Sequence, residues 1–384
     1  MTCQPVLRYC SRSIAKNREH VEQCVYSTGR QRSRLLSTVS KSRPVSKSPV
    51  YPIAVFNKHR SFSRSAMMSQ HNAKLTSKIA IVGTGEVGST IAYSLILNPV
   101  AGDILLIDPD TSRRDAQAQD LSDATYHGNT STRVRPAEPA EAADCDIIVM
   151  TAGAAQKKGE SRTDLIGKNV KILKSAIEGF KDDLGKDSKV VLLVVANPVD
   201  ILTEFAARYS GLPRSQVFGS GTFLDSARLR GILASRSGVA ASSIDSYVLG
   251  EHGDSQMVAW SHASIAGVPL DKVVTGEQID KKAIAEETKK KAAAIMEAKG
   301  ATAYGIGGVA ASICKSILFD QRNVRPVSHW QEHLGVCLSM PAVLGRAGII
   351  RTINLELNGE ESKALTESAK SLKDVIVEAE KSQN

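Results

Sequence analysis

One glycine-rich segment limits the folds open to this 384-residue chain more than any other feature of its sequence. The apolar run Lys78–Val82 predicts a strand, and Gly83-Thr-Gly-Glu-Val-Gly88 follows it directly, at the start of a stretch with helical spacing. A second apolar run at 103–107 ends at Asp108, twenty residues beyond Gly88. A glycine-rich turn between a strand and a helix, with an acid at the end of the next strand, predicts a dinucleotide-binding unit.

Each residue type in this segment suits a dinucleotide for a physical reason. Gly83 permits a tight turn, Gly85 lets the backbone approach a pyrophosphate, and Gly88 lets the helix pack closely on the strand. The free N–H groups and the positive dipole end at the helix start favour phosphate oxygens. Asp108 would accept hydrogen bonds from a ribose diol and repel a 2′-phosphate, so NAD is predicted as the cofactor rather than NADP. The alternative is a glycine-rich turn that binds no ligand.

Strand-like and helix-like segments alternate through the first part of the folded region. Further apolar runs at 145–152 and 190–196 are separated by longer charged segments with helical spacing. Strands that alternate with helices pair in parallel through right-handed crossovers, and continuous apolar strands fit a sheet covered on both faces. The predicted fold class is therefore α/β with a doubly wound parallel sheet. From about residue 210 the pattern changes to longer helices mixed with short strands.

The net charge of +9 belongs to the start of the chain. Residues 1–75 hold 14 Lys and Arg, two acids and 13 serines, whereas residues 76–384 carry a net charge of −3. This basic, Ser- and Arg-rich leader is typical of a mitochondrial transit peptide or a disordered segment. It predicts a matrix location if residues 1–62 are such a peptide. The alternative is translation from Met67 or Met68, which predicts a cytoplasmic protein.

Composition argues against several other classes of function. Because the basic residues lie in the leader, nucleic-acid binding is not expected; it would depend on residues 1–66. The apolar run 190–196 is far shorter than the roughly 18–20 residues of a membrane span, so no membrane association is expected. The six cysteines form no Cys-x-x-Cys pair. We predict unpaired, buried thiols and no metal site.

Two segments in the second half carry residue types suited to hydride chemistry. Oxidation of a secondary alcohol by NAD requires a base that titrates near neutrality and a cation that holds a carboxylate. Of eight histidines, His252 alone lies in a turn of small residues flanked by acids, Gly250-Glu-His-Gly-Asp254. Asp225 and Arg228 share one face of a predicted helix. Such a pair is more often a local salt bridge, but the Gly-rich approach 219–225 is typical of a helix start in a cleft.

From about residue 76 to its end, the chain resembles the L-lactate dehydrogenase/malate dehydrogenase family. The segments that carry the resemblance occur in the family's order: Gly83–Gly88, Asp108, Thr151–Gly153, Gln156–Arg162, Asn197–Asp200, Asp225–Arg228, Gly250–Asp254 and Lys299–Thr302. The resemblance implies a NAD-binding Rossmann domain over 76–218 and a C-terminal α+β domain, carrying the catalytic and substrate residues, over 219–384. It also implies a homotetramer, with a dimer as the alternative.

The family assigns roles that agree with this chemistry. His252 would exchange a proton with the substrate oxygen, while Asp225 would hold the imidazole in one tautomer and raise its pKa. Arg228 would bind the substrate carboxylate through two hydrogen bonds. Arg162 would lie on a mobile loop of roughly 154–167 and polarise the substrate carbonyl once the loop closes.

The resemblance also implies which further residues line the substrate and cofactor sites. Substrate contacts would come from Gln156, Asn197 and Thr302, in addition to the two arginines. The residues implied to contact the cofactor are Gly83, Gly85, Glu86, Val87, Gly88, Asp108, Thr151, Ala152, Gly153, Asn197 and Ile306.

Gln156 bears on which of the family's two substrates is used. Members that act on malate have Arg six residues before the loop arginine, whereas this chain has Gln156. The second carboxylate of oxaloacetate, enclosed beside a neutral amide, would lose several kcal/mol relative to water, so pyruvate and lactate are the expected substrates. Lys157 and Lys158 follow directly, and a loop shifted by one residue would supply the missing cation from Lys157. A malate enzyme and a non-catalytic NAD-binding protein are the alternatives.

Overall fold

The computed structural model describes residues 76–126, 131–154, 161–185, 187–274 and 279–381. The chain divides into two units, Met1–Ser61 and Phe62–Asn384, and every described residue belongs to the second. The predictions made for the leader, residues 1–75, therefore lie outside the described residues.

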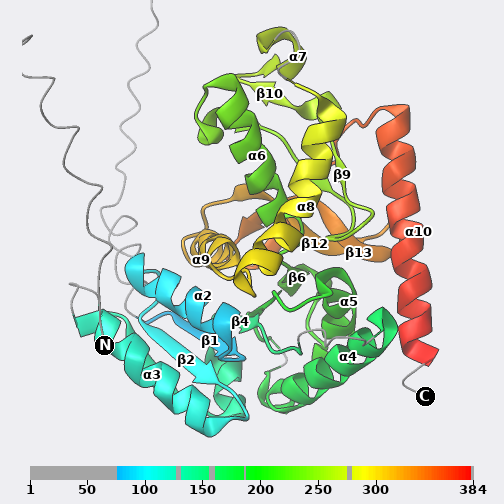
Figure 1. Ribbon diagram of the computed structural model, residues 1–384. Helices are drawn as coiled ribbons and strands as arrows, with labels where there is room; N and C mark the ends of the chain where they lie inside the picture. Colours follow the sequence, from blue (N-terminus) through cyan, green and yellow to red (C-terminus); the bar gives the residue numbers. More distant parts are fainter. Residues whose placement is uncertain (1–75, 127–130, 155–160, 186, 275–278, 382–384) are drawn as a thin grey trace, which may run out of the picture. The chain divides into compact units, whose positions relative to one another are not determined.

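Nine strands of the described region form one sheet (Figure 1). Six of them are parallel: β1 (Lys78–Val82), β2 (Asp103–Ile107), β3 (Arg133–Pro136), β4 (Ile147–Met150), β5 (Val191–Val194) and β6 (Val217–Gly219). They pair in the order β3-β2-β1-β4-β5-β6. This is the strand order of doubly wound dinucleotide-binding sheets, so the predicted fold class is confirmed.

Helices cover both faces of the parallel strands: α2 (Glu86–Leu97), α3 (Thr111–Tyr126), α4 (Arg162–Glu178) and α5 (Val199–Ser210). Successive residues of a strand point to opposite faces. Ile79 and Ile81 of β1 accordingly belong to a buried cluster that includes residues of α2 and α3. Ala80 and Val82 belong to a second cluster that includes residues of α4 and α5. Burial on both sides is the reason these strands are apolar throughout.

The second half of the chain extends the same sheet with antiparallel strands. β12 (Asn323–Gln331), β13 (Val336–Gly345) and β14 (Gly348–Thr352) continue it beyond β6, and Ser328 pairs with Gly219 at the junction. The long helices of this half are α6 (Phe223–Ser237), α8 (Lys281–Lys299), α9 (Tyr304–Leu318) and α10 (Gly359–Lys381). Its short elements are β7 (Ile244–Asp245), β8 (Val248–Leu249), β9 (Met257–Val258), β10 (Ser264–Ile265), β11 (Val268–Pro269) and α7 (Leu270–Val273).

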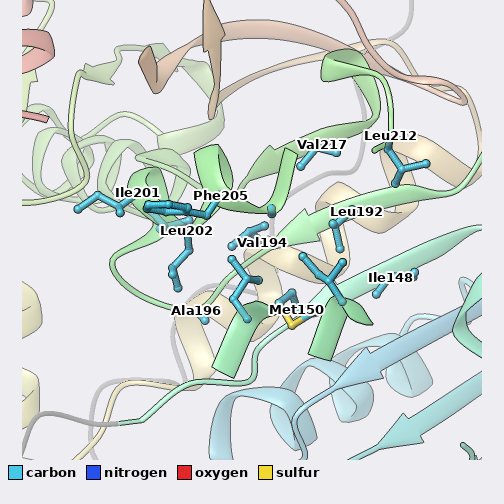
Figure 2. Packing of buried hydrophobic residues seen from close by; sticks show 14 of the residues in the cluster. Ile148, Met150, Leu192, Val194, Ala196, Ile201, Leu202, Phe205, Leu212 and Val217 are labelled. Atoms are coloured by element: carbon cyan, nitrogen blue, oxygen red, sulfur yellow. The ribbon is translucent and has the colours of Figure 1, made fainter. Parts of the chain in front are cut away.

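Part of the core between the sheet and α5 is visible in Figure 2. Leu192 and Val194 of β5 are fully buried, and Leu202 and Phe205 of α5 belong to the same cluster. Helix α10 contacts α4, α5 and β13 and adds its own apolar face to this cluster (Figure 1). The core therefore joins the parallel strands to the C-terminal helix.

Within the described ranges, no helix combines the length and the apolarity needed to cross a membrane. Cys145, Cys314 and Cys337 are buried free thiols. Burial raises the pKa of Cys145 and of Cys314 to about 12, and a thiol that stays protonated is a poor nucleophile. For these three cysteines the predicted buried thiol is confirmed.

Leu192 tests how much this core contributes to stability. Leu192→Ala is expected to lower the free energy of unfolding by about 2–5 kcal/mol, because the truncated side chain leaves a cavity. Leu97→Ala is the matched control, since Leu97 is 61% exposed on α2, and should change it by less than about 0.5 kcal/mol. Urea unfolding followed by circular dichroism measures both; equal losses in the two variants would contradict the assigned core.

Candidate active site

Where β1 passes into α2, the packing leaves no room for a side chain at Gly83 of the turn or at Gly88 of the first helical turn. Gly83 has a φ of +99°, and a Cβ there would lie 2.7 Å from the backbone N of Ala152. A Cβ on Gly88 would lie 2.0 Å from the carbonyl O of Gly83, so the first turn of α2 packs directly on the strand end. A Cβ on Gly85, in contrast, would meet no heavy atom within 4 Å. The backbone at Gly85 is therefore open to a ligand.

Asp108 is held at the end of β2 by the same turn. Its Oδ2 accepts hydrogen bonds from the backbone N of Thr84 at 2.7 Å and from Thr84 Oγ1 at 3.0 Å. Its Oδ1 accepts one from the backbone N of Asp110 at 2.9 Å. Because a carboxylate has about four acceptor sites, Asp108 retains capacity for a ribose hydroxyl while these bonds fix its orientation.

A cavity of about 810 Å³ opens beside this turn. Six residues predicted to contact the cofactor line it: Gly83, Gly85, Asp108, Thr151, Ala152 and Gly153. Its volume is within the range of cofactor pockets. The open backbone at Gly85 and the start of α2 suit a pyrophosphate, and the carboxylate of Asp108 suits a ribose diol. These residues fit NAD.

Asn169 of α4 joins the loops that follow β4 and β5. Its Oδ1 accepts a hydrogen bond from the backbone N of Ala154 at 2.7 Å. Its Nδ2 donates to the carbonyl O of Ala154 at 3.2 Å and to that of Asn197 at 2.8 Å. Asn169 is buried, whereas Asn197 is exposed at the carboxyl end of β5. Ligands of such sheets bind at this edge, so Asn197 lies where a contact is expected.

The structure brings His252 and Asp225 into direct contact. His252 Nδ1 lies 2.6 Å from Asp225 Oδ2; the Asp225 side chain is 4% exposed and that of His252 is 24% exposed. Burial disfavours the charged imidazole, but the Asp225 carboxylate outweighs burial and the pKa of His252 is raised. Burial likewise disfavours ionised Asp225, yet His252 and Arg228 together hold the pKa of Asp225 below its ordinary value.

Arg228 completes this group from the next turn of α6. Its Nη1 lies 3.2 Å from Asp225 Oδ1, and its side chain is 10% exposed. Within the described part of the chain no acceptor is bonded to its Nε or Nη2. Arg228 is therefore fixed on one side by Asp225, and its remaining N–H groups suit a carboxylate ligand.

Three elements distant in sequence hold the loop that carries His252. Gly250 exchanges two backbone hydrogen bonds with Ser339 of β13. The backbone N–H of the residue between Gly250 and His252 donates to Ser368 Oγ of α10 at 2.9 Å. The backbone N of His252 donates to Asp200 Oδ2 of α5 at 2.7 Å. The position of the imidazole thus depends on α5, β13 and α10 as well as on α6.

Other predicted site residues lie on neighbouring elements. Glu86 and Val87 form the first turn of α2, Thr302 lies between α8 and α9, and Ile306 is a half-buried residue of α9. None of these four lines the cavity beside Asp108. No hydrogen bond in the described region joins Thr302 to the His252–Asp225–Arg228 group.

The predictions for the substrate loop are mostly outside the described residues. Gln156, Lys157 and Lys158 belong to the undescribed segment 155–160. Of Arg162 the structure describes only the backbone, which begins α4. Ser161 caps that helix by accepting a hydrogen bond from the backbone N of Asp164 at 3.0 Å, so residues 162–167 are helical, which shortens the loop predicted at 154–167.

Sequence patterns did not assign roles to the buried polar residues around the site. Asn169 stands beside Val170 and three residues after Ile166, on the buried face of α4. Asp200 and Ser368 likewise occupy buried faces of α5 and α10. A polar residue inside an apolar helix stripe is the signal that could have found them, because such a group needs a hydrogen-bond partner.

A parallel sheet with a dinucleotide site, combined with a His–Asp–Arg group around a buried carboxylate, defines a NAD-dependent dehydrogenase of the Rossmann type. The family described as lactate/malate dehydrogenase, NAD binding domain, matches residues 77–219. The family described as lactate/malate dehydrogenase, alpha/beta C-terminal domain, matches residues 222–383. The chain belongs to the lactate/malate dehydrogenase family.

Among its relatives, the chain is 44% identical to L-lactate dehydrogenase A of Rhizopus oryzae over 301 residues, 78% of this chain and 92% of that protein. It is 40% identical to L-lactate dehydrogenase 1 of Staphylococcus aureus (strain USA300) over 310 residues, 79% and 97% of the two chains. A crystal structure of minor L-lactate dehydrogenase from Enterococcus mundtii is similar with a TM-score of 0.75 and 34% identity, over 79% of this chain and 98% of that chain. The crystal structure of a lactate dehydrogenase from a Medee basin deep-sea metagenome library is similar with a TM-score of 0.76 and 31% identity, over 79% of this chain and 99% of that chain.

The glycine geometry predicts two different outcomes for two similar substitutions. Gly85→Ala should weaken NADH binding at least about tenfold without lowering stability, because the added methyl meets open space in the free protein but blocks the approach of the pyrophosphate. Gly88→Ala should destabilise the fold itself, since its Cβ overlaps the backbone of Gly83. NADH fluorescence titration and thermal unfolding measure the two effects. Unchanged NADH affinity in Gly85→Ala would rule out this placement of the pyrophosphate.

Proposed function

We propose that the chain is an L-lactate dehydrogenase that interconverts (S)-lactate and pyruvate with NAD. One observation carries the proposal: His252 and Arg228 both contact the buried Asp225 carboxylate, in a chain that belongs to the lactate/malate dehydrogenase family. NAD, when bound, accepts a hydride from the alcohol carbon. The protein must then supply the proton transfer and hold the substrate.

His252 serves as the acid and base of this reaction. Its Nδ1 is occupied by Asp225 Oδ2, so Nε2 is the ring atom that exchanges a proton with the substrate oxygen. Lactate oxidation requires the neutral ring and pyruvate reduction requires the protonated one. Since the pKa of His252 is raised, pyruvate reduction persists to higher pH than an unperturbed histidine would allow, and falls as the pH rises through that pKa.

Two arginines are proposed to orient the substrate. Arg228 binds its carboxylate through the N–H groups that Asp225 does not use. Arg162, at the start of α4, polarises the carbonyl when the preceding segment closes over the site. Thr302 and Asn197 are proposed as further substrate contacts, and Ile306 as an apolar neighbour of the nicotinamide ring.

Lactate is favoured over malate by two independent arguments. Relatives 44% and 40% identical to this chain are named L-lactate dehydrogenases. Gln156 also provides no positive charge for a second substrate carboxylate, and an uncompensated carboxylate in a closed pocket is costly. We further propose a homotetramer, with residues 76–218 as the dinucleotide-binding domain and 219–384 as the substrate domain. Regeneration of NAD during sugar fermentation is the metabolic role that this reaction would serve.

The purified full-length protein is expected to oxidise NADH with pyruvate at a kcat/KM at least about tenfold above that with oxaloacetate. His252→Asn should lower kcat for pyruvate by at least about a hundredfold, because it removes the proton donor, while NADH still binds. Absorbance at the NADH band measures the rates. A faster reaction with oxaloacetate would reassign the protein to malate, and full activity of His252→Asn would remove the proposed mechanism.

Gln156→Arg should shift this preference towards oxaloacetate. The new guanidinium would pair with the second carboxylate, and a ratio change of about tenfold or more in kcat/KM is expected. Gln156→Lys tests whether charge alone suffices, and Lys157→Ala is the control for the neighbouring lysine. If Lys157→Ala, and not the change at Gln156, altered the response to oxaloacetate, the loop register assumed for Gln156 would be wrong.

A further inference from the structure

His252 is held by two buried carboxylates that come from different helices. Asp225 of α6 contacts the ring at 2.6 Å. Asp200 of α5 contacts the main chain of the same residue, its Oδ2 accepting from the backbone N at 2.7 Å. Asp200 is 2% exposed, which places a second acidic group in the protein interior next to the residue that exchanges the proton.

Asp200 is not explained as a helix cap. Although it lies in the first turn of α5, no N–H of α5 donates to its carboxylate among the described residues; Oδ2 is used by His252. Its Oδ1 makes no hydrogen bond of standard geometry in the described region, and neither does the fully buried Ser328 Oγ of β12, although that hydroxyl lies near enough to lower the pKa of Asp200. A buried carboxylate with one satisfied oxygen is costly, so a purely structural role would favour a fully bonded or apolar residue.

Polar and titratable groups of four further segments act on Asp200, on the neighbouring His252, or are acted on by Asp200. Burial raises its pKa to about 6, although the Ser328 hydroxyl and then the backbone and ring of His252 lower it, and Glu251 of the same loop raises it. From α6, Asp225 and Arg228 act on His252 with opposite signs. The negative charge of Asp200 is also among the causes that raise the pKa of the Cys337 thiol of β13.

We propose that Asp200 is a second positioning residue for His252: its carboxylate fixes the main chain that carries the imidazole and adds a negative charge that favours the protonated ring. This inference rests on the proposed function, because it concerns the proton exchanged at His252. Asp225 sets the tautomer and most of the proton affinity through the ring, whereas Asp200 acts through the backbone and through space. Asp200 is therefore not itself a catalytic residue.

The proposal predicts a pH dependence with a definite sign. Above about pH 6 Asp200 is ionised and stabilises protonated His252, while below that pH the carboxyl is neutral and this stabilisation is absent. Asp200→Asn keeps an oxygen that accepts from the backbone N but never carries the charge. It therefore resembles the low-pH form of the wild type at every pH.

The experiment compares kcat/KM profiles of full-length wild type and Asp200→Asn between pH 5 and 10. The basic limb for pyruvate and the acidic limb for lactate should both move to lower pH by about one unit, so that pyruvate reduction is roughly tenfold slower above both midpoints while the two proteins converge near pH 5. A structural defect would lower the rates without moving either limb. Equal midpoints in the two proteins would overturn the proposal.

Two further variants separate the charge of Asp200 from a general effect of altering a buried polar group. Glu361→Gln is the matched control, because Glu361 is also a buried acid that accepts from a backbone N, that of Ser261, but in a different part of the fold; its midpoints should equal those of wild type. Ser328→Ala removes the hydroxyl that lowers the pKa of Asp200, and should move both limbs in the same direction as Asp200→Asn by a smaller amount. If Asp200→Asn does not fold, unmoved limbs in Ser328→Ala overturn the proposal.

A direct titration separates this inference from the proposed function. The His252 ring can be followed by NMR of histidine labelled at Cε1, with the signal assigned from its loss in His252→Asn. A protein that does not reduce pyruvate would fail the proposed function, whereas the ring titration would still report whether Asp200→Asn lowers the pKa of His252. An unchanged ring titration in an active enzyme would overturn the role of Asp200 alone.

Discussion

The candidate active-site group depends on compensation of the negative charge of one buried carboxylate. Asp225 is 3% exposed, and an ionised carboxylate in such a place is stable only when it is paired and hydrogen-bonded. The His252 ring and the Arg228 guanidinium provide this pairing from two directions. Both contacts lower the pKa of Asp225. The Asp225 carboxylate in turn raises the pKa of His252, against the opposing effects of burial and of the Arg228 charge. One interaction therefore stabilises the buried acid and favours the protonated imidazole that the proposed reaction needs.

The remainder of the fold brings these three side chains to one place. Asp225 and Arg228 need only the helix α6, because a separation of three residues puts them on one face. His252 arrives on a separate loop, and Ser339, Ser368 and Asp200 hold that loop from β13, α10 and α5. The antiparallel extension of the sheet and the C-terminal helix thus support the position of the imidazole, beyond their contribution to the core.

The candidate cofactor site has a simpler origin, since its residues are close in sequence or lie on adjacent strands. β1 lies between β2 and β4, so the strand ends at Gly83, Asp108 and Thr151 meet at one edge of the sheet. The cavity beside them is lined by residues from all three strand ends. A glycine at position 83 is required by the positive φ and by the proximity of Ala152, whereas a Cβ at position 85 would meet no heavy atom of the protein within 4 Å.

Local patterns in the chain were sufficient to predict the strands β1 and β2, the glycine turn, the parallel character of the sheet and the shared helix face of Asp225 and Arg228. These features depend on residue spacing, apolar runs and backbone freedom, which a single segment contains. The folded arrangement was needed to establish that α5, β13 and α10 anchor the His252 loop, that Asn169 joins two loops, and that Asp200 lies against the main chain of His252. Those contacts join residues far apart in the chain, and no local pattern records which buried polar group will meet which partner.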